Sequence, residues 1–148
     1  KFIFDIVGPA DSQLDQNYKS ELVRKIKEAG LSSQIKFLDS IPQSKLPELY
    51  SASMFCINLT ESGSFDKTIW ESVFCGCLPV VHNSSFLDEV PVDIRENIEV
   101  TSLDAQNVSN VFKKAINSDG LPDIGARLMQ LAEQHSLQVL IAKLMKII

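Results

Sequence analysis

The residues best suited to chemistry lie in a polar segment, residues 60–71, that follows an apolar run. Ser62, Gly63 and Ser64 are small, so a ligand could approach the backbone of this segment closely. The residues that follow read as the start of a helix, and the free N–H groups and positive dipole end of a helix favour a bound phosphate. We expect Ser64 to be the N-cap of this helix and Asp66 to be an acidic residue of its first turn. The segment therefore predicts a phosphate site at a helix N-terminus.

The predicted helix carries a polar face that extends this site. At about 100° per residue, one face collects Ser64, Lys67, Thr68 and Glu71. Glu71 lies ~10 Å along the axis from Ser64, so its carboxylate could accept hydrogen bonds from two vicinal sugar hydroxyls of a ligand whose phosphate lies at the helix tip. Lys67 could meet that phosphate as a point charge. A structural alternative fits the same spacing, because Ser64 could cap the helix while Lys67 and Glu71 form an i,i+4 ion pair on a solvated face.

The three cysteines, Cys56, Cys75 and Cys77, do not predict a metal or redox site. Their number is odd, whereas a disulfide framework needs pairs. One residue separates Cys75 from Cys77, which is tighter than the spacing of a zinc knuckle, and no second Cys/His pair follows. We interpret them as small buried hydrophobic residues near a helix end.

Two polar residues beside apolar runs, Asn58 and His82, each allow a functional interpretation and an alternative without a functional role. Asn58-Leu59-Thr60 fits the glycosylation acceptor pattern, but it adjoins a segment predicted to be buried, so a chance match is the better account. His82 follows a predicted strand and could hydrogen-bond a ligand, or it could be an ordinary polar loop residue.

Composition limits the class of protein. The chain has 148 residues, of which 45% are hydrophobic, so it can bury the core of one globular domain. Its formal charge of −5 argues against binding to nucleic acid. No apolar run reaches the ~18 residues that span a bilayer, and no signal peptide is visible, so we expect a cytoplasmic location. Because the first residue is not Met and already belongs to a predicted strand, we expect the chain to be an excised domain.

The order of predicted elements indicates the fold. Strands and helices alternate along most of the chain, which is typical of a parallel sheet with helices on both faces. We therefore expect residues 1–148 to form a single Rossmann-like α/β domain. The expected strands are residues 2–7, 35–38, 54–59, 78–81 and 98–100. The expected helices are residues 14–29, a short helix from Pro42, and residues 66–75, 105–116, 121–134 and 136–148. We expect Asp119-Gly120 to end the helix over residues 105–116.

Several stretches in the same order resemble one enzyme family. Leu46-Pro47-Glu48-Leu49-Tyr50-Ser51-Ala52-Ser53-Met54-Phe55, the segment 61–71 and Cys75-Gly76-Cys77-Leu78-Pro79-Val80-Val81 resemble the C-terminal domain of family-four retaining glycosyltransferases. Ile6-Val7-Gly8, Phe37-Leu38-Asp39-Ser40-Ile41 and His135-Ser136-Leu137 are similar to the same family. The resemblance implies the C-terminal half of a GT-B fold, which holds a nucleotide-sugar donor, in an enzyme of polysaccharide or glycolipid biosynthesis.

The resemblance also implies roles for individual residues. Glu71 matches the second glutamate of the family's paired-glutamate motif, which binds the ribose hydroxyls. The other implied donor contacts are Gly63, Ser64, Phe65 and Asp66, whose backbone meets the diphosphate and sugar, with Lys67 and Thr68 beside them, and Leu38, Asp39 and Ile41 for the base. No metal or other cofactor is implied, because helix N-termini and basic side chains neutralise the diphosphate in this fold.

The sequence departs from the family pattern in ways that leave alternatives open. The paired glutamates are usually eight positions apart, but Gly63 lies eight before Glu71, and Glu61 lies ten before it. We assign the catalytic role to Glu61, the alternative being that no carboxylate fills it. The family's first strand-helix unit, with its phosphate-binding Arg and Lys, and the acceptor-binding half do not appear before Lys1. We therefore expect no glycosyl transfer by this chain alone. We expect a glycan or lipid-linked acceptor to bind to the other half of the enzyme, and any contact with the inner face of a membrane to be made by that half.

Two other function classes stay open at this point. The chain could be a non-catalytic α/β module that binds a protein partner, which the ambiguous first glutamate favours. It could also belong to another GT-B enzyme, such as a sugar-nucleotide epimerase or a glycogen-type synthase.

Overall fold

The computed structural model describes residues 2–60, 66–136 and 145. The chain divides into two compact units, Lys1–Leu46 and Pro47–Ile148, and each is described by itself. In both, a helix connects two parallel strands, as the alternating sequence pattern predicts. Mixed α/β structure with parallel strands is therefore confirmed.

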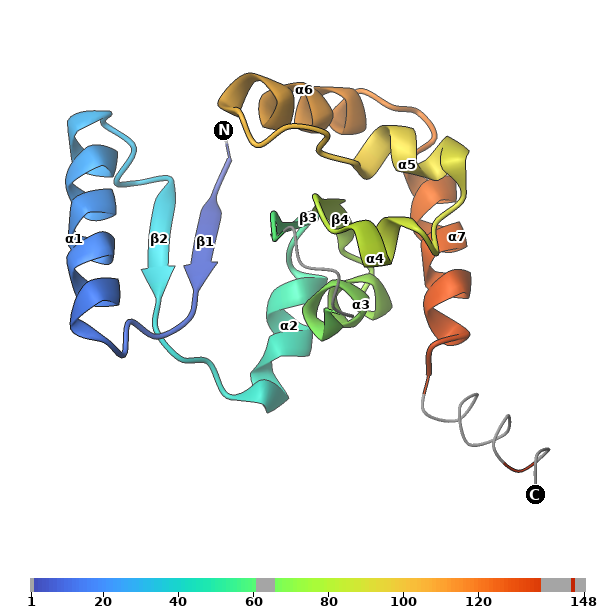
Figure 1. The fold of residues 1–148 in the computed structure, drawn as a ribbon, viewed down its shortest axis with the longest axis horizontal. Coiled ribbons are helices and arrows are strands. Elements are labelled where there is room, and N and C mark those ends of the chain that lie inside the picture. Colours follow the sequence, from blue (N-terminus) through green and yellow to red (C-terminus); the bar gives the residue numbers. More distant parts are fainter. Residues whose placement is uncertain (1, 61–65, 137–144, 146–148) are drawn as a thin grey trace. The chain divides into compact units, whose positions relative to one another are not determined.

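The first unit is one strand–helix–strand crossover (Figure 1). Strand β1 (Phe4–Val7) pairs in parallel with β2 (Ile35–Leu38), and α1 (Gln13–Glu28) connects them. Ser12 begins α1 through a capping box with Asp15, in which each side chain accepts a hydrogen bond from the other residue's backbone. Gly30, at φ 70°, lets the chain leave the helix in the left-handed region. A short 3-10 helix, η1 (Gln43–Lys45), closes the unit and replaces the helix start expected at Pro42.

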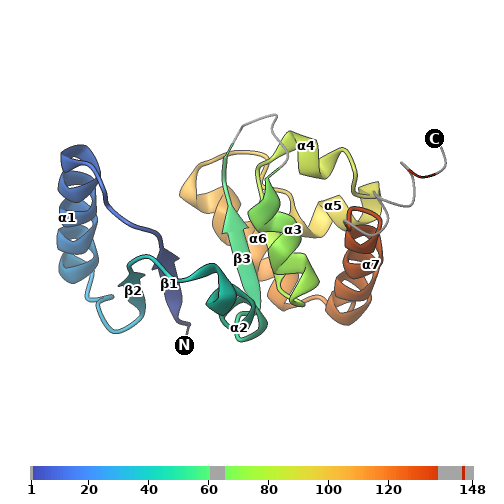
Figure 2. The same ribbon diagram turned by 90° about the horizontal axis from the view of Figure 1, so that it is seen from below.

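The second unit contains a buried strand between helical layers. Strand β3 (Phe55–Asn58) pairs in parallel with β4 (Leu78–Val81), and every residue of β4 is buried. Helices α3 (Lys67–Phe74) and α6 (Ala105–Ile116) lie on opposite sides of the strands (Figures 1 and 2). The remaining helices are α2 (Leu46–Ser51), α4 (Ser84–Leu87), α5 (Val92–Ile98) and α7 (Leu121–Glu133).

Aromatic contacts hold the layers of this unit together. Phe55 of β3 meets Phe112 of α6 edge to face, with ring centroids 5.2 Å apart. On the other side, the Trp70 ring of α3 lies 4.8 Å from Phe86 and 4.2 Å from the His135 ring, which follows α7. Trp70 is only 4% exposed, so these rings are part of the core rather than of a ligand site.

The C-terminal third differs from expectation at two places. The strand expected at residues 98–100 is wrong: α5 continues to Ile98, and only an isolated bridge joins Val81 to Glu99. Ile94 and Ile98 are one helical turn apart and both fully buried, so packing favours the helix. Helix α6 ends at Asn117, its C-cap, while Gly120 begins α7 instead of ending α6. Most of the helix expected over residues 136–148 lies outside the described residues.

Candidate functional site

Asp66 is the N-cap of helix α3, so the prediction that Ser64 has this role is wrong. One carboxylate oxygen of Asp66 accepts hydrogen bonds from the backbone N–H of Thr68, at 3.0 Å, and from the Thr68 hydroxyl, at 2.7 Å. Asp is as good an N-cap as Ser, and the hydroxyl two positions on gives Asp66 a second donor. Asp66 is therefore the cap itself and not a first-turn acid.

Asn58, the last residue of β3, connects both ends of the intervening loop. Its amide nitrogen donates to the second carboxylate oxygen of Asp66 at 2.5 Å. Its amide oxygen accepts from the backbone N–H of Thr60 at 3.2 Å and from the Thr60 hydroxyl at 2.7 Å. The strand end, the start of the loop and the start of α3 are thus held by one side chain.

These hydrogen bonds also set the charge state of the cap. Burial by itself would raise the pKa of Asp66, but the hydrogen bonds from Thr68 and Asn58 outweigh it and lower that pKa below the ordinary 3.8. Asp66 therefore carries its negative charge at neutral pH, with both oxygens already occupied by the protein.

The rest of α3 has the two faces that the helical wheel predicts. Lys67 and Thr68 are exposed and Glu71 is half-buried, whereas Ile69 and Val73 are buried. No ion pair joins Lys67 to Glu71, both of which the structure describes, so the purely structural alternative for this pair is not realised. The first turn of α3 therefore presents the Lys67 side chain to solvent, while the Thr68 hydroxyl is bonded to Asp66.

Glu71 faces a more enclosed environment than Lys67. Burial, with smaller contributions from nearby charges that include those of Cys56 and Glu71, raises the pKa of Tyr50 to about 12. The Tyr50 hydroxyl is therefore protonated at neutral pH and can donate a hydrogen bond. Sequence reasoning did not include Tyr50 in the site, and its half-buried place on α2 could only be found from the structure.

The predicted base-binding residues lie at the end of β2 and in the loop after it, in the first unit. Leu38 and Ile41 are half-buried, and Asp39 is exposed. The Lys19 ammonium lies 2.8 Å from an Asp39 oxygen and 5.6 Å from the centre of the Phe37 ring. Hydrogen bonding and charge from Lys19 lower the pKa of Asp39. Lys19 is a second residue that sequence reasoning missed.

Four predicted residues, Glu61, Gly63, Ser64 and Phe65, lie outside the described residues. The structure therefore leaves the assignment of the catalytic glutamate to Glu61 as a prediction. The same holds for the backbone contacts expected from Gly63, Ser64 and Phe65.

Burial lowers the reactivity of two of the three cysteines. Cys77 is buried, Cys56 and Cys75 are half-buried, and all three are free thiols. Burial raises the pKa of Cys77 to about 12 and also raises that of Cys56, so neither is a reactive thiolate at neutral pH. Across residues 2–60 and 66–136, no group of three His, Cys, Asp or Glu side chains is arranged to hold a metal ion.

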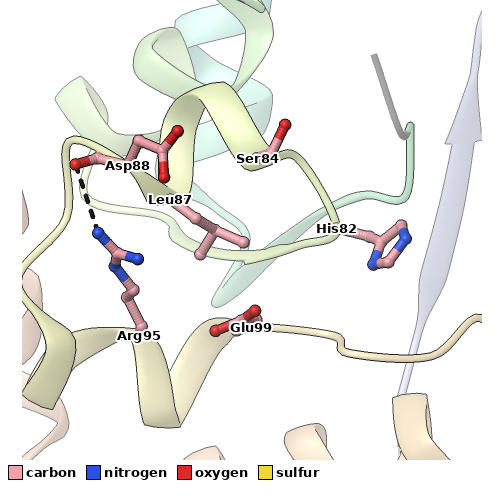
Figure 3. A pocket seen from close by; sticks show the side chains of 6 residues that line it. All are labelled: His82, Ser84, Leu87, Asp88, Arg95 and Glu99. Carbon is pink, nitrogen blue, oxygen red and sulfur yellow. Dashed lines mark hydrogen bonds between the residues drawn. The ribbon is translucent and has the colours of Figure 1, made fainter. Parts of the chain in front are cut away.

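A pocket of about 220 Å³ opens beyond the carboxyl end of β4 (Figure 3). It contains His82, whose Nδ1 lies 2.5 Å from the carbonyl oxygen of Val100. Sequence reasoning singled out only His82 here, because the pocket arises from a turn and a helix that the sequence pattern did not predict. Its lining residues are His82, Ser84, Leu87, Asp88, Arg95 and Glu99.

Comparison with known proteins gives the family. The model of the family "Glycosyl transferases group 1" matches residues 1–130. Crystal structures of Anabaena Alr3699/HepE, one in complex with UDP and one with UDP and glucose, align with 99% of this chain at a TM-score of 0.76 and 22% identity. The chain spans 41% of the HepE chain.

None of the curated proteins matches it in sequence. Within the described residues, no helix is both long and apolar enough to cross a membrane. The parallel α/β architecture and a family match over most of the sequence place this chain in the group 1 glycosyltransferase family, with the fold of the C-terminal half of a GT-B enzyme.

Proposed function

We propose that this chain binds the nucleotide-sugar donor of a glycosyltransferase. The observation that carries the proposal is the first turn of α3, which Asn58 and Asp66 fix at the carboxyl end of β3. Ligands of open parallel sheets bind at this edge, and phosphates favour helix N-termini. The UDP complexes of HepE, a protein of the same fold, support a nucleoside diphosphate as the ligand.

The described residues divide the work of donor binding. The first-turn N–H groups of a helix have no acceptor within the helix. The Asp66 carboxylate accepts from the N–H of Thr68, which leaves the N–H groups of Lys67 and Ile69 for the ligand. Lys67 adds a positive charge to them. Glu71, one turn further along, accepts hydrogen bonds from the ribose hydroxyls. In this proposal Asp66 is a positioning residue and does not itself contact the donor.

The remaining assignments follow from the family. Leu38, Asp39 and Ile41 contact the base, Gly63, Ser64 and Phe65 the diphosphate and sugar, and Glu61 is the catalytic carboxylate. The parent enzyme transfers the sugar with retention to a glycan or lipid-linked acceptor, without a metal or other cofactor. It works in the cytoplasm, with any contact to the membrane made outside these 148 residues. The isolated chain does not catalyse transfer, which is supported by its covering 41% of HepE.

Calorimetric titration of the chain with UDP tests the proposal. We expect a Kd of ~1 mM, which corresponds to about −4 kcal/mol. Glu71→Gln should weaken binding about tenfold, because a hydrogen bond to a charged group contributes ~1.5–3 kcal/mol. Lys67→Met should weaken binding and reduce its dependence on salt.

A matched control separates site effects from general charge effects. Glu96→Gln removes a carboxylate from the exposed surface of α5 and should leave the Kd unchanged. Equal affinities of the Glu71→Gln and Glu96→Gln variants would contradict the assignment of Glu71. Absence of binding by the wild-type chain would favour a non-catalytic interaction module instead.

A further inference from the structure

The pocket beyond β4 is a second candidate ligand site, and all of its lining residues belong to the described part of the second unit. Figure 3 shows Leu87 in its centre, with Arg95 and His82 on opposite sides and Glu99 across from Ser84. Its volume of about 220 Å³ lies below the ~300–1,000 Å³ of sites for drug-sized ligands. A single sugar ring, or one end of a larger ligand, is the size of group that such a pocket admits.

Arg95 supplies fixed hydrogen-bond donors to this pocket. Its Nε donates to the carbonyl oxygen of Val90 at 2.7 Å, and its Nη2 donates to that of Asp88 at 3.3 Å (Figure 3). These bonds use two of the five N–H groups of the guanidinium and fix its plane. The other N–H groups are held in place for a ligand without further ordering of the side chain.

Glu99 and Ser84 supply acceptors and a hydroxyl. The backbone of Glu99 is fixed by its N–H, which donates to the carbonyl oxygen of Arg95 at 2.8 Å, and by the bridge to Val81. Within the described part of the chain, no hydrogen bond or ion pair engages the Glu99 carboxylate or the Ser84 hydroxyl. A carboxylate accepts from two vicinal hydroxyls at once, and a serine hydroxyl both donates and accepts.

Charge and polarity select the class of ligand. Two carboxylates, of Asp88 and Glu99, line the pocket against one guanidinium, so an anion such as phosphate is disfavoured. No metal-binding cluster is present among the described residues. The buried side chain of Leu87, 7% exposed, provides an apolar surface between the polar groups. Alternating donors and acceptors around an apolar patch suit a neutral ring that carries hydroxyls.

We propose that this pocket binds a neutral sugar ring, with Glu99 accepting from its hydroxyls, Arg95 donating to them and Leu87 packing against its apolar face. The choice of a sugar among neutral hydroxylated ligands rests on the proposed function. The ring comes from a free sugar or a glycan end, because the sugar of the nucleotide-sugar is assigned to Gly63, Ser64 and Phe65 in the proposed function.

NMR of the full 148-residue chain tests this proposal with four probes: glucose, UDP-glucose, UDP and glucose 6-phosphate. We expect glucose to shift the Leu87 methyl and Arg95 Nε–H signals, and glucose 6-phosphate to bind no more tightly than glucose. UDP alone should shift the amides of residues 66–71 and leave the pocket signals in place. Pocket shifts by glucose would support a free sugar or a glycan end as the source, and pocket shifts that appear with UDP-glucose but not with glucose would contradict it.

Two pocket variants and one control make the test decisive. Glu99→Gln should raise the Kd for glucose about tenfold, and Ser84→Ala, which changes one hydroxyl on an exposed residue, should raise it by a smaller factor. Glu96→Gln should leave it unchanged. Pocket signals that ignore both glucose and UDP-glucose, or glucose shifts that neither pocket variant weakens, would overturn the proposal. The response of residues 66–71 to UDP reports separately on the proposed function.

Discussion

Asn58 shows how one side chain can connect the end of a strand to the start of the next helix. It lies at the end of β3 and is bonded both to Thr60, where the loop begins, and to Asp66, where α3 begins. Its pattern with Thr60 matches a glycosylation acceptor, yet in the structure its amide is half-buried and engaged by these contacts. We therefore interpret Asn58 as a structural residue of the site.

Removing the Asn58 amide should destabilise the fold. Asn58→Ala leaves the second oxygen of Asp66 and the Thr60 hydroxyl without their partner, and we expect a loss of ~1–3 kcal/mol in the free energy of unfolding. Urea denaturation measures it. Asn110→Ala, at an exposed position on α6, should change stability by no more than ~0.5 kcal/mol. Equal effects of the two substitutions would show that the Asn58 hydrogen bonds contribute little.

Asp66 should give the chain a specific sensitivity to acid. Because its pKa is lower in the folded state than the ordinary 3.8, its contribution to stability is present above that value and disappears as the pH falls through the folded pKa. Asp66→Asn keeps a good N-cap but removes the charge. Its free energy of unfolding should therefore fall less than that of the wild type as the pH is lowered from about 5 to 2.

The comparison between Asp66→Asn and the wild type matters more than the absolute pH profile. Hydrogen bonds from Arg127 and Ser102 lower the pKa values of Asp93 and Asp104 in the same direction, so the whole chain loses stability in acid. Parallel stability curves for the wild type and the variant would contradict the assignment of a depressed pKa to Asp66.

At the scale of elements, local sequence signals were sufficient where one pattern dominated. Strands β2 and β4 occur at the predicted residues because each is a short apolar run, and Gly30 and Gly76 end α1 and α3 as glycine in the left-handed region does. Residues 98–100 were misassigned because apolar, polar and apolar residues alternate there. Burial of Ile94 and Ile98 on one helical face favours a helix over a strand here. This burial could not be predicted locally, because it depends on contacts with residues distant in sequence.

Part of the candidate site could likewise be predicted from the sequence, and part could not. The polar and apolar faces of α3 follow from helical periodicity alone, whereas the half-buried position of Glu71 beside the exposed Lys67 does not. The choice of Asp66 as the cap, and its bond to Asn58, could not be predicted, because both depend on where a strand end meets a helix start. The pocket that Arg95 and Glu99 line could not be predicted either, because it also depends on how a strand end and a helix are placed in space.

Two glycines give opposite predictions at the element scale. Gly76 has φ 81°, and no atom lies within 4 Å of the point where a Cβ would stand, so Gly76→Ala should cost ~1–2 kcal/mol through backbone strain alone. Gly125 lies within α7 and is equally unobstructed, so Gly125→Ala should stabilise the chain by ~0.5–1 kcal/mol. Thermal unfolding of both variants checks the pair. A stabilising Gly76→Ala, or a destabilising Gly125→Ala, would show that backbone conformation does not control these positions.

At the scale of the whole molecule, charge, family and fold are consistent with the proposed ligand. A net charge of −5 disfavours a polyanion, yet one phosphorylated ligand needs only a local site, which the first turn of α3 offers through its N–H groups and Lys67. The group 1 glycosyltransferase family and the fold shared with HepE are consistent with that site. The central claim is therefore that the donor binds at α3.

Amide NMR titration of the chain with UDP, GDP and ADP tests this claim most directly, because it shows where a nucleotide binds as well as whether it does. We predict that one nucleotide shifts the amides of residues 66–71 more than the others do, and that Glu71→Ala weakens or abolishes the shifts. Shifts confined to other parts of the chain, or no response to any of the three at concentrations well above ~1 mM, would contradict the account.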